Sequence, residues 1–129
     1  MKKVSREVKI LGFVVVAVLV LVLFSLRPSP KGEYDNFANC ITNSGAKMFG
    51  AYWCSNCNNQ KDLFGSSFDN IQYIECSLPN KGGQTPECNQ EGITGYPTWE
   101  FADGERVAGF TSLVQLSLKT GCPLVKDSN

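Results

Sequence analysis

Two cysteines separated by two residues lie between an apolar segment and a polar, helix-forming one. Residues 47–53, before the pair, have the composition of a strand, and residues 58–64, after it, have that of a helix. Cys54 would therefore lie at a helix N-terminus, where unpaired backbone N–H groups and the helix dipole favour a thiolate. Because the thiolate is the form that attacks a disulfide, Cys54 and Cys57 are placed to alternate between dithiol and disulfide.

A lone CxxC pair also fits an inert disulfide, or half of a Cys₄ zinc site that Cys76 and Cys88 would complete. A zinc site usually brings a second CxxC or histidines at ligand spacing, and this chain has neither. We therefore expect redox activity without metal or cofactor, with Cys54 attacking and Cys57 resolving. The alternative is a non-catalytic module whose cysteines are structural or bind zinc.

The other four cysteines are expected to form structural disulfides. Cys76 and Cys88 flank a loop that a disulfide between them would hold, and Cys40 and Cys122 could join the two ends of the domain. A redox relay through Cys76 and Cys88 is the alternative. All six cysteines follow an apolar N-terminal run, which indicates an oxidising compartment.

That apolar run covers residues 10–26, just long enough for a membrane-spanning helix, and no small-x-small cleavage site follows it. Four basic residues precede it and two follow, which predicts a cytoplasmic N-terminus over residues 1–9. We expect a transmembrane anchor, or an uncleaved signal, at 10–26. A linker at 27–33, a domain at 34–124 and a tail at 125–129 would then lie outside the cytoplasm, in the periplasm or extracellular space.

Charge divides the chain in the same place. From Glu33 onward it carries 11 acidic and 6 basic residues, a net charge of −5. An acidic domain argues against nucleic-acid binding. Its partners are therefore expected among proteins and at the membrane.

Hydrophobic periodicity and turn residues predict eight elements after the linker. Asp35 is the expected N-cap of the first helix, and Thr85 that of the third. Asp103 and Gly104 form the expected turn of a hairpin. Strands joined by helices favour parallel pairing, and the hairpin adds an antiparallel edge, which gives an α/β fold with a four-stranded mixed sheet flanked by helices. The elements are a helix at 35–45, a strand at 46–53, a helix at 54–64, a strand at 71–76, a short helix at 85–92, strands at 98–101 and 105–109, and a helix at 111–120.

This order resembles the thioredoxin fold, on the motifs Trp53-Cys54-Ser55-Asn56-Cys57 and Gly95-Tyr96-Pro97-Thr98. More narrowly, the chain is similar over residues 37–123 to the thioredoxin-like domain fused to, or encoded beside, bacterial homologues of vitamin K epoxide reductase. The segments that carry this second likeness are Gly50-Ala51-Tyr52-Trp53-Cys54, Gln60-Lys61-Asp62-Leu63-Phe64-Gly65, Tyr73-Ile74-Glu75-Cys76-Ser77, Glu91-Gly92-Ile93 and Tyr96-Pro97-Thr98-Trp99.

The resemblance implies a thiol–disulfide oxidoreductase that exchanges disulfides with substrate proteins and with a membrane enzyme of the vitamin K epoxide reductase type. It would act as an oxidase, or in the opposite direction as a reductase. Pro97 is implied to be cis and to lie beside the cysteine pair, which leaves the backbone of Tyr96 free to pair with a substrate. Trp53 and Tyr96, each next to a site residue, are expected to line the docking surface.

Two positions depart from the family's pattern. Asn56 stands where strongly oxidising members carry histidine, so a less oxidising couple is expected. Met48 falls where thioredoxins bury a carboxylate that accepts a proton. Glu75 and water are the remaining candidates for the base that serves the second thiol.

Overall fold

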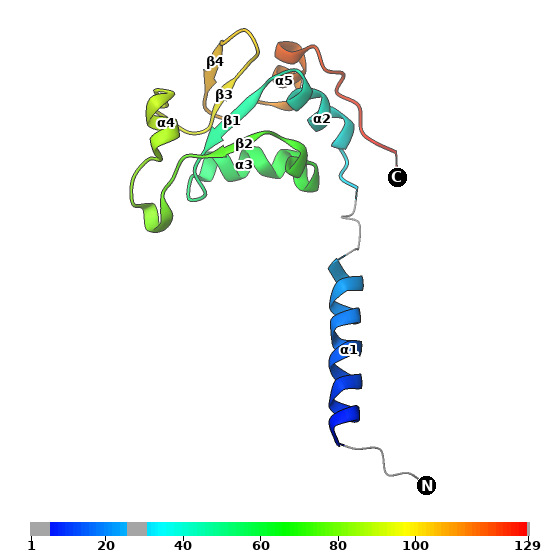
Figure 1. Cartoon of the computed structure of the whole chain (residues 1–129). Coiled ribbons are helices and arrows are strands. Elements are labelled where there is room, and N and C mark those ends of the chain that lie inside the picture. Colours follow the sequence, from blue (N-terminus) through cyan, green and yellow to red (C-terminus); the bar gives the residue numbers. More distant parts are fainter. Residues whose placement is uncertain (1–5, 26–30, 129) are drawn as a thin grey trace. The chain divides into compact units, whose positions relative to one another are not determined.

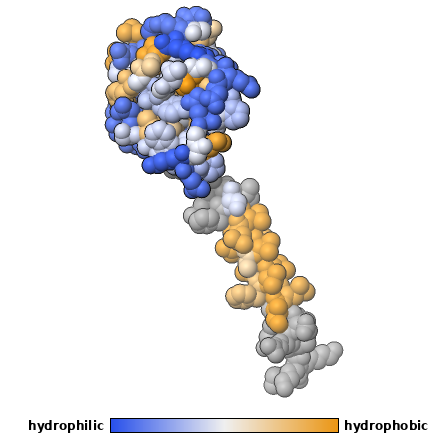
Figure 2. All heavy atoms as spheres, turned by 90° about the vertical axis from the view of Figure 1, so that its left-hand side faces the viewer, coloured by the Kyte–Doolittle hydropathy of each residue, from blue (hydrophilic) through white to orange (hydrophobic). Residues whose placement is uncertain are grey.

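The computed structural model describes residues 6–25 and 31–128 and divides the chain into two compact units, Met1–Pro30 and Lys31–Asn129 (Figure 1). The first unit holds helix α1 (Arg6–Ser25). Figure 2 shows a hydrophobic surface on the face of α1 that is turned to the viewer. Among the described residues, no helix meets the length and hydropathy required to cross a membrane. Leu26, the last residue of the expected anchor, and residues 27–30 of the expected linker lie outside the described residues.

The second unit contains helices and strands in the order that the sequence predicts, with two 3-10 helices added. Its elements are α2 (Asp35–Asn43), β1 (Lys47–Gly50), α3 (Ser55–Phe64), η1 (Gly65–Asn70), β2 (Tyr73–Glu75), η2 (Pro79–Lys81), α4 (Pro86–Gln90), β3 (Thr98–Glu100), β4 (Arg106–Ala108) and α5 (Leu113–Thr120). Each observed strand is shorter than the predicted one.

The strands form a four-stranded mixed sheet in the order β2-β1-β3-β4. β1 pairs with β2 in parallel, and the crossover between them carries α3. β1 pairs with β3, and β3 with β4, in antiparallel fashion. The predicted mixed sheet and its antiparallel hairpin are therefore confirmed.

Buried side chains cover both faces of this sheet. Met48 of β1 packs in a large cluster whose other members come mainly from α2, α3, β3 and α5. The next residue, Phe49, packs in a smaller cluster with Cys76, Cys88 and Ile93. Successive strand residues point to opposite faces, so β1 is buried on both sides. The mixed sheet and the helices that pack on it fit an α/β thioredoxin-like fold.

Two disulfides close the domain. Cys40 in α2 is bonded to Cys122, which follows α5, with Cα atoms 5.9 Å apart. Cys76, after β2, is bonded to Cys88 in α4, with Cα atoms 5.6 Å apart. The first bond joins segments 82 residues apart, and the second closes a loop across 12 residues.

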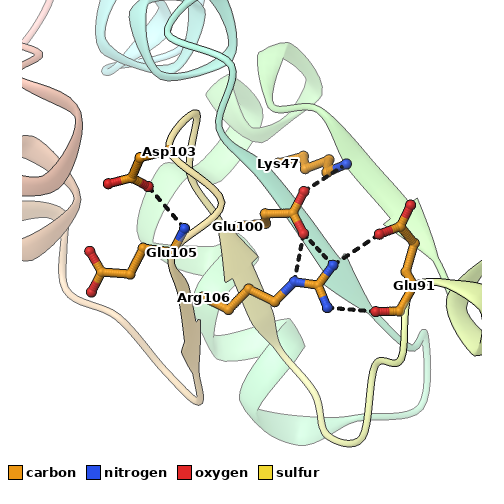
Figure 3. A network of polar contacts seen from close by, with 6 residues as sticks. All are labelled: Lys47, Glu91, Glu100, Asp103, Glu105 and Arg106. Carbon is orange, nitrogen blue, oxygen red and sulfur yellow. Dashed lines mark hydrogen bonds and ion pairs between the residues drawn. The ribbon is translucent and has the colours of Figure 1, made fainter.

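An ion-pair network joins three strands to the end of α4 (Figure 3). Glu100 of β3 accepts from Lys47 of β1 at 2.9 Å and pairs with Arg106 of β4. The guanidinium of Arg106 also reaches the Glu91 carboxylate at 2.9 Å. The network therefore links the edge strand β4 to the segment that leads from α4 toward Pro97.

Candidate functional site

Cys54 is the N-cap residue of α3, as the sequence predicts. Its backbone is extended, and its sulfur accepts a hydrogen bond from the backbone N–H of Cys57 at 3.3 Å. The sulfur thus takes the place that a serine or aspartate oxygen occupies in an ordinary cap. Cys54 is half-buried and Cys57 is fully buried, and both are free thiols.

The two thiols have different environments. Burial raises the pKa of Cys57 to about 12, and its hydrogen bond with Cys54 acts in the same direction. The backbone of Ala51 and the charge of Lys61 oppose this rise. Cys57 is therefore a neutral thiol at neutral pH, whereas Cys54 faces the surface at a helix start.

The segment around Pro97 lies against Cys54. The Tyr96–Pro97 peptide bond is cis, which confirms the expectation from the resemblance. The carbonyl oxygen of Tyr96 accepts a hydrogen bond from the Cys54 thiol at 3.6 Å, and Pro97 is fully buried. Residues that lie 42 positions apart in the sequence thus form one site.

Trp53 and Tyr96 form an aromatic rim beside Cys54. Their ring centroids are 6.0 Å apart in an edge-to-face arrangement, and 45% of Trp53 is exposed. The Trp53 indole N–H donates to the Ser77 hydroxyl at 2.7 Å, and the Tyr96 hydroxyl donates to Gln84. The structure brings together both residues that the sequence analysis assigned to docking, and their binding role stays a prediction.

Tyr52 extends this rim, although the sequence analysis gave it no role. It is 45% exposed, and its hydroxyl accepts a hydrogen bond from the backbone N–H of Lys81 at 2.9 Å. The three aromatic side chains therefore each bond to the loop over residues 77–84. The aromatic pair Tyr52-Trp53 before Cys54 is the sequence signal that could have indicated this contact.

The Cys₄ zinc alternative fails. Cys76 and Cys88 are bonded to each other, so they are not thiolates available to a metal shared with Cys54 and Cys57. Across residues 6–25 and 31–128, no cluster of three or more His, Cys, Asp or Glu side chains could hold a metal ion. The redox relay alternative needs the bond between Cys76 and Cys88 to open, and it stays a prediction.

A group of polar side chains surrounds Cys57 on its buried side. The Tyr73 hydroxyl donates to Glu75 at 2.8 Å, and both residues lie on β2. The amino group of Lys61 lies 3.8 Å from the Tyr73 ring centroid. Glu75 was a candidate base from the sequence, and Tyr73 was not, although alternate strand residues point to the same face.

A buried glutamine fixes the helix that carries both thiols. Gln60, fully buried on α3, donates to the carbonyl of Thr111 at 2.9 Å and accepts from its N–H at 2.8 Å. These two hydrogen bonds join α3 to the backbone of the segment that precedes α5. Gln60 lies one helical turn from Cys57, so it holds the buried thiol in place.

The chain is similar to part of a curated protein. No protein-family model matches the sequence. In an alignment of 92 positions, which covers 67% of the chain, it is 37% identical to thiol-disulfide oxidoreductase LTO1 of Arabidopsis thaliana. The matched part is 24% of that relative's length. The mixed sheet with its helices and this similarity fit a thioredoxin-like domain.

Proposed function

We propose that the chain is a membrane-anchored thiol–disulfide oxidoreductase that exchanges disulfides with proteins outside the cytoplasm. One observation carries the proposal: Cys54 caps α3 with its sulfur 3.3 Å from the Cys57 N–H, while Cys57 is buried behind it. An accessible sulfur next to an inaccessible one is what an attacking and a resolving thiol require. The similarity to part of a named thiol-disulfide oxidoreductase supports the same activity.

The exchange begins with the disulfide form of the pair. A substrate thiolate attacks the sulfur of Cys54, the Cys54–Cys57 bond breaks, and Cys57 leaves with the electron pair and takes up a proton. The second thiol of the substrate then loses its proton and attacks the substrate sulfur in the mixed disulfide. The substrate leaves oxidised, and Cys54 and Cys57 remain as two thiols.

The rim beside Cys54 would hold the substrate during this exchange. The exposed faces of Tyr52 and Trp53 offer apolar contact to a segment whose thiol reaches Cys54. The backbone of Tyr96 lies next to the same sulfur and suits pairing with an extended chain. These features favour unfolded protein segments as substrates.

The reduced pair needs an electron acceptor to complete a cycle. We assign this role to a membrane enzyme of the vitamin K epoxide reductase type, because the chain contains segments that resemble the thioredoxin-like domains of such enzymes. The apolar sequence of α1 supports a place for this helix in lipid. A reductase that runs in the opposite direction is the alternative.

Trapping tests the exchange. Changing Cys57 to Ala should leave substrates bound to Cys54 as mixed disulfides, which non-reducing gels resolve and mass spectrometry identifies. Changing Cys54 to Ala is the matched control and should trap almost nothing. Equal trapping by both variants, or by neither, would refute the assignment of attacking and resolving roles.

The reduction potential decides the direction of flow. Without a histidine between the cysteines, we expect a couple between DsbA and thioredoxin, about −120 to −270 mV. Equilibration with glutathione buffers measures this value. A potential near about −120 mV favours the oxidase, and one near about −270 mV favours the reductase.

Membrane attachment has its own test. The whole chain should stay with membranes through alkaline carbonate extraction, and protease added outside right-side-out cells should digest the domain. Replacing Val18 and Leu19 by lysine places two charges in the apolar segment, which should release the chain because each charge opposes insertion by about 2.5–3.5 kcal/mol. Wild-type chain in the carbonate supernatant would contradict the anchor.

A further inference from the structure

Three hydrogen-bond donors hold the carboxylate of Glu75 next to Tyr73. Its Oε1 accepts from the backbone N–H of Ser77 at 2.9 Å and from that of Tyr52 at 3.2 Å. Its Oε2 accepts from the hydroxyl of Tyr73 at 2.8 Å. These bonds fix the carboxylate between β2 and the backbone of Tyr52, with Oε2 turned to Tyr73.

Gly50 places the Tyr73 hydroxyl and the Cys57 sulfur around the same small space. A Cβ at Gly50 would lie 3.1 Å from Tyr73 Oη and 3.2 Å from Cys57 Sγ. It would also lie 2.8 Å from the Tyr73 ring, so a side chain here would push one of the two neighbours away. The absence of a side chain at Gly50 therefore lets Tyr73 Oη and Cys57 Sγ border one common space.

The titratable groups around Cys57 and Tyr73 come from three parts of the domain. They are Cys54 at the start of α3, Lys61 on α3, Tyr73 and Glu75 on β2, and Tyr96 before Pro97. Among these groups, Glu75 is the one carboxylate. It is therefore the natural acceptor of a proton from this cluster.

The Tyr73 hydroxyl is suited to pass a proton on, but not to remain as a negatively charged tyrosinate. Burial, and then its hydrogen bond to Glu75, raise the pKa of Tyr73 well above the ordinary value, so a free tyrosinate does not form at neutral pH. Its oxygen, however, still has lone pairs that can accept a proton while its own proton moves to Glu75. Cys57 needs such a path, because burial keeps it a neutral thiol.

We propose that Glu75 accepts the proton of the Cys57 thiol through the hydroxyl of Tyr73. This inference rests on the proposed exchange of disulfides through Cys54 and Cys57. Glu75 thereby takes the role for which a carboxylate is missing at Met48, a position that is fully buried on β1.

The step begins from a mixed disulfide between Cys54 and a substrate. The Cys57 proton passes to Tyr73 Oη as the tyrosine proton passes to Glu75 Oε2, which leaves tyrosine neutral and glutamate protonated. The Cys57 thiolate attacks Cys54 Sγ, a bond forms between the two cysteines, and the substrate sulfur leaves with the electron pair of the broken bond. That sulfur takes a proton from solvent, and Glu75 returns its proton to solvent.

A chromogenic disulfide, dithiobis(nitrobenzoate), separates the two thiols of the reduced full chain. Attack by Cys54 releases the first coloured thiol, and resolution by Cys57 releases the second, so one trace gives both rates. At pH 7, Tyr73→Phe and Glu75→Gln should each slow the second phase at least tenfold and change the first less than twofold. Glutamine can still accept from the Ser77 and Tyr52 N–H groups, so it keeps the local structure.

The pH profile distinguishes proton transfer from a purely structural effect. In both variants, the rate of the second phase should come closer to the wild-type rate as the pH rises toward 9. At that pH, hydroxide removes the thiol proton directly. Tyr34→Phe, a half-buried tyrosine outside the cluster, is the matched control and should leave both phases unchanged.

The outcomes are separable. The relay is overturned if either variant has a second-phase rate within twofold of wild type. It is also overturned if the ratio of the variant rate to the wild-type rate does not change with pH. A wild-type protein with no second phase at all would contradict the proposed exchange itself.

Discussion

At the scale of single residues, Cys54 and Cys57 differ because one helical turn separates a cap position from a buried one. The Cys54 sulfur accepts the N–H of Cys57 and also lies against the Tyr96 carbonyl, at the surface of the domain. Cys57 points inward, toward Gly50 and Tyr73. The asymmetry of the pair therefore follows from the helix start.

This asymmetry predicts which thiol reacts. Burial holds the pKa of Cys57 at about 12, so at pH 7 almost all of it is thiol. We expect iodoacetamide to alkylate Cys54 at least a hundredfold faster than Cys57 in the folded, reduced protein. Peptide mass spectrometry after a timed quench measures both rates. Cys57 should become reactive in urea, and faster labelling of Cys57 before unfolding would reverse the assigned roles.

The sequence predicted the residues of the site that short motifs identify, and missed those that depend on register. Cys54, Cys57 and Pro97 follow from local spacing and from the resemblance. Gly50 and Tyr73 meet because β1 and β2 pair with Gly50 opposite Glu75. No local pattern gives a register between parallel strands that a whole helix separates.

At the scale of elements, α3 is fixed by its buried amide. Gln60 satisfies both the N–H and the C=O of Thr111. Changing Gln60 to Ala should lower the free energy of unfolding by about 2–6 kcal/mol, because each of the two buried backbone groups left unpaired costs about 1–3 kcal/mol. Urea unfolding measures the change. Asn59→Ala, an exposed neighbour on the same helix, is the control, and an equal effect there would contradict a specific role for Gln60.

The ion-pair network of Figure 3 makes the packing of β3 and β4 depend on pH. Partial burial acts to raise the pKa of Glu100, but hydrogen bonds from Lys47 and Arg106 outweigh it and hold the pKa below its usual value. A lowered pKa means that this carboxylate stabilises the fold above about pH 4.3, the unfolded-state value. That contribution disappears as the pH falls through the lower folded-state value.

Comparison with Glu100→Gln tests this dependence. Wild type should be the more stable protein at pH 6, and the difference in free energy of unfolding should narrow as the pH falls below about 4.3, the unfolded-state pKa. Urea unfolding at several pH values gives the two curves. Glu87→Gln, an exposed carboxylate outside the network, should follow wild type throughout. Parallel curves for wild type and Glu100→Gln would show that the network has no role in acid stability.

Local signals placed the elements better than their ends. Thr85 caps α4 as predicted, with its side chain accepting from the Cys88 N–H. Asp35 does not cap α2, so that prediction was wrong. Tyr34 holds the cap position, and the Asp35 carboxylate instead accepts from the Gly32 N–H and the Asn70 side chain. The Asn70 partner lies 35 residues away, which a local capping rule does not consider.

At the scale of the whole molecule, the second unit is closed where its two ends meet. The Asp127 N–H donates to the carbonyl of Glu33 at 2.8 Å, and its carboxylate accepts from the Asn36 N–H at 2.9 Å. The bond between Cys40 and Cys122 joins the same regions. The sequence indicated that these two cysteines could meet, but contacts between chain ends depend on the completed sheet and could not be derived from local patterns.

The long disulfide should therefore govern the global stability of this unit. In the chain-entropy model, closing 82 residues stabilises by about 4.5 kcal/mol, and closing 12 residues by about 2.8 kcal/mol. Replacing Cys40 and Cys122 together by Ser should lower the free energy of unfolding by up to about 4.5 kcal/mol, which urea unfolding measures. Replacing Cys76 and Cys88 should cost less in global stability. Because neither pair includes the reacting thiols, both double variants should still form mixed disulfides through Cys54 while folded, and loss of exchange in a folded Cys76/Cys88 variant would give that bond a redox role.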